Sequence, residues 1–244
     1  MINYFNYNGK DSRDFGILIR YKKTYNKPTR DISFVSVSGR SGDIIIDNGK
    51  YNNGDFAYGI TLFAPESNSG DNENTDLAYA TYDLRNWMSA DNTYYKLFDS
   101  YDPHYYVKAC LTKGIDFDTV NSHIAKTELE FTCKPYRYRF DGDNTEILGK
   151  TGSLYNTEIH SSLPYIKIYG SGDLALHING QQSEFYDVSS YIEIDSDMMN
   201  VFKGLTNLND KFSGVFPELQ PGINQISVSG DATKIEIIPR WRTI

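Results

Sequence analysis

The sequence predicts a mainly β protein with two domains, an N-terminal β-sandwich-like domain that carries one α-helix and a C-terminal β-sandwich. Three observations support this fold class. Segments in which apolar and polar residues alternate recur along the chain, and one segment alone has the helical period. Aromatic residues make up 14% of the chain, which is typical of β structure and too many for a disordered protein. The length of 244 residues suits one large or two ordinary domains.

The first predicted strand, residues 32–37, breaks the expected alternation. Its apolar residues switch parity between Phe34 and Val35. We expect either a β-bulge at this point or a strand that is buried on both faces. Residues 38–42 read Ser-Gly-Arg-Ser-Gly and lack the lysine and the following helix of a phosphate-binding loop. They therefore predict a bend between strands.

One amphipathic helix is predicted over residues 75–90. Its apolar residues recur at intervals of three and four: Leu77, Ala80, Leu84, Trp87 and Met88. Asn74 or Thr75 can cap its start, and Asp76 suits the positive end of the helix dipole. We expect the apolar stripe to pack on a sheet. The polar segment before it, residues 67–74, lacks the glycine and glutamate positions of an EF-hand and predicts a mobile loop.

The remaining strands are predicted from period-two alternation, which places one set of side chains on each face of a sheet. They are residues 126–133, 173–178, 191–195, 225–229 and 234–238. Asn179-Gly180 predicts a tight hairpin after the second of these strands. Gly230-Asp231 predicts a turn between the last two, and Pro239 should end the final strand.

A domain boundary is expected between residues 134 and 150. Residues 141–144 read as a turn, and after Gly149 and Gly152 only strand and turn signals remain. The expected domains are residues 1–138 and 139–244.

The composition excludes several classes of function. The net charge is −8 and the basic residues form no long run, which argues against sequence-specific nucleic-acid binding. No segment reaches the about 20 apolar residues that insert across a bilayer. The N-terminus lacks the basic start and apolar run of a signal peptide, so we expect synthesis in a cytosol. Cys110 and Cys133 are then expected to be buried free thiols.

No motif predicts catalysis, a metal or a cofactor. The four histidines stand alone in sequence, and two cysteines are too few for a four-cysteine zinc site. Neither a glycine-rich phosphate loop nor a Gly-x-Ser-x-Gly elbow occurs. We expect a protein that is not an enzyme. A hydrolase with two carboxylates remains an alternative, but 32 acidic residues make some close pair inevitable, so the sequence does not single out a catalytic pair.

A series of short sequence segments occurs in a fixed order along nearly the whole chain. Together these segments identify a protein family more specifically than any single motif does. The first half contains Phe5-x-Tyr7-Asn8-Gly9, Asp14-Phe15-Gly16-Ile17, Pro28-Thr29-Arg30, Gly39-Arg40-Ser41-Gly42, Leu84-Arg85-Asn86-Trp87 and Cys133-Lys134-Pro135-Tyr136. The second half contains Pro164-Tyr165-Ile166-Lys167, Gly214-Val215-Phe216-Pro217, Pro221-Gly222-Ile223-Asn224 and Pro239-Arg240-Trp241-Arg242. The ordered set resembles the distal tail proteins of long, non-contractile-tailed phages of Gram-positive bacteria. Ser38 stands where that family usually has a proline before its Gly-Arg-x-Gly turn.

The resemblance implies a structural hub at the virion tail tip, assembled in the cytoplasm of the host bacterium. Such proteins form a six-fold ring, a homohexamer, whose N-terminal domains surround a channel for DNA. The ring joins the tail tube protein to the tip or tail-associated lysin protein. The C-terminal domains are galectin-like, jelly-roll sandwiches that bear receptor-binding or baseplate proteins or touch cell-wall saccharide. The net charge of −8 suits a channel that must let DNA pass.

A closed ring requires one face of each copy to meet a different face of the next. The N-terminal half offers apolar material for this contact: Tyr21, Tyr25, Phe34, Val35, Val37, Ile44, Ile45 and Ile46. From these residues and their bend we select Phe34, Val35, Val37, Arg40 and Ile45 as ring-interface candidates. If the strand is buried on both faces, its sheet could be packed between subunits. Alternatively, the strand could be buried inside a single domain. Arg40 can reach a neighbouring copy or make a local turn contact.

The alternative function is a carbohydrate-binding module that attaches to the host cell wall through the C-terminal sandwich. Aromatic residues serve sugar stacking in such modules, and the candidates here are Tyr165, Tyr169 and Tyr186. Their other interpretation is packing in the core and on the sheet faces. An exposed aromatic residue beside a few polar groups would favour the module.

Overall fold

The computed structural model describes residues 2–23, 28–64, 73–89 and 91–244. The chain forms two compact units, residues 1–137 with residue 244, and residues 138–243. The division falls inside one long strand, β10 (Ile124–Arg139), and each unit has its own hydrophobic core. Tyr25 and most of the predicted mobile loop, residues 67–72, lie outside the described residues.

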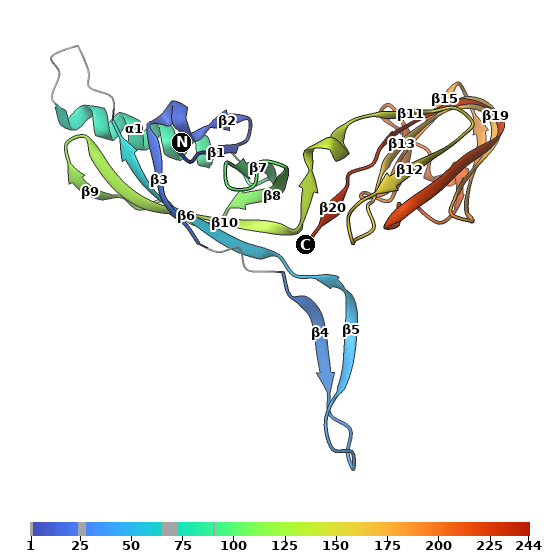
Figure 1. The fold of residues 1–244 in the computed structure, drawn as a ribbon, viewed down its shortest axis with the longest axis horizontal. Helices are drawn as coiled ribbons and strands as arrows, with labels where there is room; N and C mark the ends of the chain where they lie inside the picture. Colours follow the sequence, from blue (N-terminus) through green and yellow to red (C-terminus); the bar gives the residue numbers. More distant parts are fainter. Residues whose placement is uncertain (1, 24–27, 65–72, 90) are drawn as a thin grey trace. The chain divides into compact units, whose positions relative to one another are not determined.

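The first unit is built on one large sheet with the hydrogen-bonded strand order β2-β1-β7-β8-β10-β6-β3 (Figure 1). Besides β10, its strands are β1 (Phe5–Tyr7), β2 (Lys10–Asp11), β3 (Ile17–Lys22), β6 (Gly54–Phe63), β7 (Tyr95–Asp99) and β8 (Tyr105–Leu111). β9 (Asp118–Asn121) also pairs with β10. The predicted alternation in residues 126–133 is confirmed, because Leu129, Phe131 and Cys133 are buried while Lys126 faces solvent.

The predicted helix is present as α1 (Glu73–Met88), and its apolar stripe packs into the core of this unit. Trp87 anchors it: the indole stacks on Phe15 of the short 3-10 helix Ser12–Phe15, with 4.2 Å between ring centroids, and its Nε1 donates a hydrogen bond to the Tyr7 carbonyl at 3.0 Å. The helix begins at Glu73, upstream of the predicted start. The capping predicted for Asn74 or Thr75 concerns side chains that lie outside the described ones.

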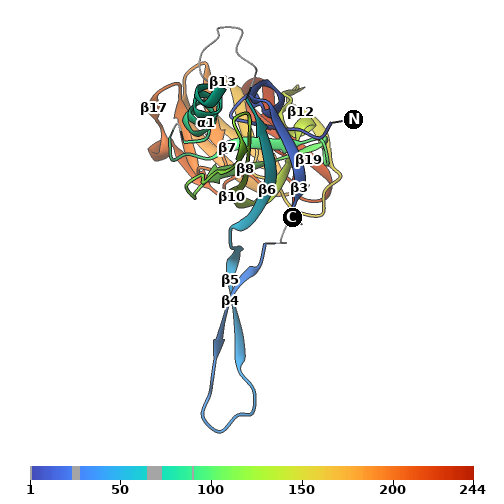
Figure 2. The ribbon, with the colours of Figure 1, turned by 90° about the vertical axis from the view of Figure 1, so that its left-hand side faces the viewer.

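Two strands of the first unit stand apart from the large sheet. β4 (Arg30–Val35) and β5 (Ile44–Tyr51) pair only with each other among the described strands, as a two-stranded hairpin. Figures 1 and 2 show this hairpin extending away from the strands β3 and β6 to which it is joined.

The second unit is a β-sandwich without an α-helix among its residues. The principal strand order is β11-β19-β13-β15-β16-β17, with β12 on β19 and β14 between β13 and β18. The strands are β11 (Glu146–Leu148), β12 (Thr151–Asn156), β13 (Tyr165–Ile178), β14 (Gln181–Val188), β15 (Tyr191–Asp195), β16 (Asn200–Lys203), β17 (Thr206–Asn207), β18 (Phe212–Gly214) and β19 (Gly222–Ile238). The short strand β20 (Arg242–Thr243) pairs with β10 instead. Leu174, Leu176 and Ile178 point into the core as predicted. The Asn179-Gly180 hairpin is also confirmed, with φ of 52° and 84° as a two-residue turn requires.

The predicted turn at Gly230-Asp231 is wrong. The chain continues through it as β19, which pairs with β13 on both sides of a register shift opposite Ser171 to Ala175. Gly170 and Gly230 allow β13 and β19 to approach closely and bend together at this point. A Cβ on Gly230 would lie 2.3 Å from the Asp173 carbonyl oxygen. Strands that bend at bulges can contribute to both layers of a sandwich, so one pair of long strands joins the layers. β19 ends at Ile238, before Pro239, as predicted.

Only one of the two thiols is buried as predicted. Cys133 is fully buried on β10, and burial raises the pKa of its thiol, so it is a poor nucleophile. Cys110 is half-buried because Ala109 takes the core position on β8 and turns its neighbour to the other face. Both cysteines are free.

The close approach of β13 and β19 makes a prediction about Gly170. A Cβ there would lie 2.7 Å from the Asp231 oxygen and 2.8 Å from the Ala232 Cα. Gly170→Ala should lower the unfolding free energy of the second unit by about 1–3 kcal/mol, through overpacking. Gly149→Ala is the matched control, because its Cβ would meet nothing within 4 Å. Hydrogen exchange of the β13 and β19 amides measures the stability of the second unit in both variants. Equal protection in Gly170→Ala and Gly149→Ala would contradict the account.

Candidate functional site

The hairpin of β4 and β5 is the first candidate site, because it exposes apolar side chains on both faces. Phe34 pairs with Ile45 and Val35 with Ile44, so one face carries Phe34 and Ile45 and the other Val35 and Ile44. Phe34 and Ile45 are 61% and 63% exposed. A two-stranded hairpin is marginally stable in water, and one with two apolar faces needs a partner surface.

The root of the hairpin is polar, in contrast to its outer half. Arg30 forms an ion pair with Asp47 at 2.6 Å and lies over the Tyr51 ring, 5.0 Å from its centroid. Lys50 lies 3.1 Å from the Asp31 carboxylate. These ion pairs hold β4 and β5 in register at the root of the hairpin. The apolar outer half is therefore presented as a formed hairpin.

The structure excludes two interpretations of this strand, a bulge between Phe34 and Val35 and burial inside a single domain, and its packing between subunits stays a prediction. The register is continuous through Phe34 and Val35, and the bulge lies at Asp31 instead. The strand is not buried inside its domain. Val37 and Arg40 are exposed in the connecting bend, where the Arg40 amide donates to the Val37 carbonyl at 3.1 Å. The Arg40 guanidinium has no hydrogen bond or ion pair with another described residue, so its local contact is made by the backbone alone.

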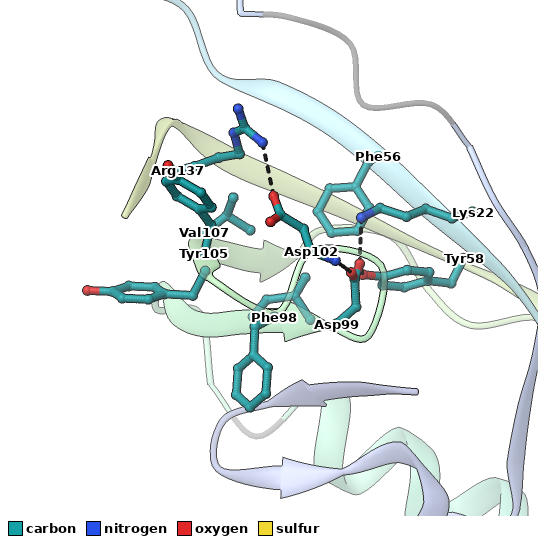
Figure 3. A pocket seen from close by; sticks show the side chains of 11 residues that line it. Lys22, Phe56, Tyr58, Phe98, Asp99, Asp102, Tyr105, Val107 and Arg137 are labelled. Carbon is teal, nitrogen blue, oxygen red and sulfur yellow. Dashed lines mark hydrogen bonds and ion pairs between the residues drawn. The ribbon is translucent and has the colours of Figure 1, made fainter. Parts of the chain in front are cut away.

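A buried carboxylate at the end of β7 is the second candidate site (Figure 3). Asp99 is only 4% exposed and accepts hydrogen bonds from Lys22 at 2.5 Å, from the Tyr58 hydroxyl, and from the Tyr101 and Asp102 amides at 3.0 and 3.2 Å. The Lys22 ammonium also lies 5.7 Å from the Phe56 ring centroid. Burial, followed by the Asp99 charge, raises the pKa of Tyr58 well above its usual value. The charge of Asp99 is therefore fully compensated.

The cavity beside Asp99 does not resemble a substrate site. It measures about 70 Å³, room for water but well below the about 300–1,000 Å³ of ligand pockets. Asp102, the other carboxylate on its wall, forms an ion pair with Arg137 at 3.0 Å. Figure 3 shows both acids turned toward their cations. We therefore interpret the cluster as a structural tie between β3, β6 and the end of β7.

The charges of the described residues do not favour an acid catalyst. A glycosidase needs one carboxyl whose pKa is raised. Hydrogen bonds lower the pKa of five described carboxyls: Asp11, Asp31, Asp47, Glu128 and Glu236. Burial alone would raise the pKa of Asp195, but Arg240 binds both of its oxygens, at 2.7 and 2.8 Å, and lowers it. No group of three metal-ligating side chains occurs in the described part of the chain.

Two of the three predicted saccharide-contact tyrosines are engaged in an internal network on the second unit. The Tyr165 and Tyr169 hydroxyls donate to Glu193 and Glu236, at 2.6 and 3.0 Å. Lys234 lies over the Tyr169 ring, 4.2 Å from its centroid. Tyr186 is exposed on β14 but donates its hydroxyl to Glu184 at 2.5 Å. The structure does not bring the three tyrosines together as one open platform.

Comparisons with known proteins identify a shared fold. The chain is similar to the solved structure of SPP1 Dit (gp 19.1), described as a paradigm of the hub adsorption apparatus in phages that infect Gram-positive bacteria. The TM-score is 0.69 at 13% sequence identity, and the match covers 100% of both chains. No protein-family model and no curated protein sequence matches the chain. The resemblance found in the sequence is thus confirmed as a likeness of fold along the whole chain. No helix among the described residues is long and apolar enough to cross a membrane.

The structural interpretation of Asp99 can be tested against its neighbour in sequence. Asp99→Ala leaves Lys22 and Tyr58 without their partner and should destabilise the first unit by about 3 kcal/mol, as for other broken buried pairs. Asp102→Ala removes a half-exposed ion pair and should cost at most about 1 kcal/mol. Hydrogen exchange of the β6 and β7 amides reports both variants. A larger loss from Asp102→Ala would contradict the assignment.

The buried phenols also predict an alkaline instability. Burial raises the pKa of Tyr7 to about 12, and that of Tyr58 is raised as well. The unfolded chain releases these protons near pH 10, below the folded values, so their stabilisation is complete below about pH 10 and is lost above it. The unfolding midpoint of the first unit in urea should fall as pH rises past about 10. This fall in the midpoint should be smaller in Tyr58→Phe and the same as in the wild type in Tyr79→Phe, an exposed control. An equal dependence of the midpoint on pH in the wild type and both variants would refute the prediction.

Proposed function

We propose that this protein is a structural hub of a phage tail tip. The likeness of fold to SPP1 Dit, along both whole chains, supports a place in a tail adsorption apparatus. In this proposal the chain forms a six-fold ring through its first unit, located at the virion tail tip and assembled in the host cytoplasm. The role is structural and involves no catalysis, metal or cofactor.

The observation that carries the proposal is the β4–β5 hairpin. A ring closes when a surface on each copy binds a different surface on the next, so each copy needs a projecting contact that its own fold leaves unpaired. The hairpin meets this requirement, with Phe34 and Ile45 on one face and Val35 and Ile44 on the other. Permanent interfaces bury about 2,000 Å² or more around an apolar centre, and the hairpin supplies part of such a centre.

The residues of the hairpin bend extend this assignment. Val37 continues the apolar surface, and the exposed Arg40 guanidinium is placed to bind a carboxylate or carbonyl of the neighbouring copy. The ring would enclose the channel for DNA and join the tail tube protein to the tip or lysin protein. The net charge of −8 is consistent with a wall that does not hold DNA. The second unit would bear receptor-binding or baseplate proteins.

The test is the mass of the purified full chain in solution. Light scattering on a size-exclusion column, over a concentration series, should give a mass near six times the 27.8 kDa of one chain. The double variant Phe34→Asp and Ile45→Asp should remain a monomer at the same concentrations, because it places charge in the centre of the interface.

The control replaces an equally exposed apolar residue of the second unit. Ile147→Asp, at a site 66% exposed, should leave the hexamer intact. A wild-type chain that stays monomeric at every concentration would contradict self-assembly of the ring. A hexamer that tolerates both hairpin charges would move the ring contact elsewhere.

A further inference from the structure

Four asparagines of this chain directly precede a glycine: Asn8, Asn48, Asn53 and Asn179. An Asn-Gly bond can rearrange without an enzyme, because glycine has no side chain to hinder its amide nitrogen. The glycine nitrogen attacks the asparagine Cγ, so an N–Cγ bond forms and the Cγ–Nδ2 bond breaks. The amide proton leaves with the side-chain nitrogen as ammonia. Water then opens the cyclic imide at either carbonyl, which leaves aspartate or isoaspartate.

Tight turns restrain two of these bonds. Asn8 and Asn179 each begin a two-residue turn, with φ of 50° and 52°, and paired strands close both turns. The Asn179 side chain is also held at both ends. Its Nδ2 donates to Asn224 at 2.8 Å, and its Oδ1 accepts from the Gln225 amide at 2.9 Å. The attack needs the side chain and the next amide to rotate toward each other, so these contacts must break first.

A buried strand restrains the bond after Asn53. Gly54 is the first residue of β6, is buried, and pairs with Cys133 on β10. The Asn53 Nδ2 donates to the Tyr94 hydroxyl at 2.9 Å. The attacking nitrogen would have to leave the sheet before it could reach the side chain.

The bond between Asn48 and Gly49 lies instead where the ladder of the β4–β5 hairpin is interrupted. The register leaves one residue of β4, Asp31, opposite three residues of β5, residues 48–50. Asn48 and Gly49 are both exposed, and Gly49 has a φ of 72°, which glycine adopts without strain. The backbone of an unpaired, exposed bulge is freer to rotate than that of a closed turn or a buried strand.

The hydrogen bonds around this bond are exposed to solvent. The Gly49 amide donates to the Asp47 carboxylate at 2.9 Å. The Asn48 Nδ2 donates to Asp31 and Ser33 at the longer distances of 3.2 and 3.3 Å. Exposed hydrogen bonds cost little to break, because water replaces the lost partner. The attacking nitrogen and the side-chain carbonyl at this position are therefore the least restrained of the set.

We propose that Asn48 is a site of spontaneous deamidation, and that it reacts faster than Asn8, Asn53 or Asn179. The product changes the root of the hairpin in two ways. A carboxylate replaces the amide that donates to Asp31, so an attraction between β4 and β5 becomes a repulsion between like charges. Isoaspartate also adds a methylene to the main chain inside the bulge. Both changes loosen the part of the hairpin that holds its strands in register.

The reaction acts as a slow clock on the unassembled chain. A chain whose hairpin root has loosened no longer presents the apolar outer half as a formed hairpin. In the ring proposed above, such a chain would be a poor subunit. This consequence rests on the proposed function, whereas the reaction at Asn48 does not.

The experiment ages the purified full chain at mildly alkaline pH and follows every Asn-Gly peptide in the same sample by mass spectrometry. Conversion at Asn48 should be at least about tenfold faster than at Asn53 and Asn179, which must first break internal contacts. It should also precede conversion at Asn8. Asn48→Gln keeps the amide but needs a larger ring for the attack, so position 48 should stay unmodified in this variant.

The structural effect is read by nuclear Overhauser contacts between the paired residues Ser33 and Ile46. They should weaken in the aged chain and in Asn48→Asp, which supplies the carboxylate directly, and persist in aged Asn48→Gln. Equal or slower conversion at Asn48 than at any other Asn-Gly site would overturn the proposal, and so would unchanged contacts in a fully converted chain.

The double variant Phe34→Asp and Ile45→Asp, aged in parallel, separates this proposal from the ring. It should convert at Asn48 even if the wild type forms rings that cover the site. A wild type that is always monomeric would refute self-assembly of the ring but leave the order of conversion as the test of this site.

Discussion

The free energy of the β4–β5 hairpin in water constrains the rest of this protein. A two-stranded sheet gains little from its own hydrogen bonds, and here both faces carry apolar side chains, including Phe34 and Ile45. Ion pairs at the root, such as Arg30 with Asp47, keep the strands in register but do not cover those faces. The tie of Asp99 to Lys22 and Tyr58 fixes the end of β3 against β6 and β7. The unit therefore carries a projection whose apolar faces its own fold leaves exposed.

The second unit is held together by one pair of long strands, β13 and β19. The bend of β13 and β19 at Gly170 and Gly230 brings one pair of long strands into both layers, which closes a core without a helix. On this unit, the Tyr165 and Tyr169 hydroxyls donate to glutamates, and Arg240 and Lys234 lie over their rings.

Much of the fold could be predicted from periodicity, and most errors concern long-range geometry. The helical stripe ending at Trp87 and the Asn179-Gly180 hairpin are local patterns, and both are present. Gly230-Asp231 has the sequence of a turn, but pairing with β13 keeps it extended, which no local signal reports. The parity switch at Phe34 predicted a bulge there or a strand buried on both faces, and the strand has neither in the single chain. Its exposure, rather than burial inside a domain, became visible only when the other strands of the sheet were placed.

The candidate sites, like the errors in the predicted fold, depend on contacts between distant parts of the chain. Lys22, Tyr58 and Asp99 are far apart in sequence and meet only through the sheet. The central claim is most directly tested by an electron cryo-microscopy reconstruction of the purified chain. The account predicts a closed six-fold ring in which Phe34 and Ile45 contact the neighbouring copy. A ring that leaves the hairpin in solvent, or no ring at any concentration, would contradict it.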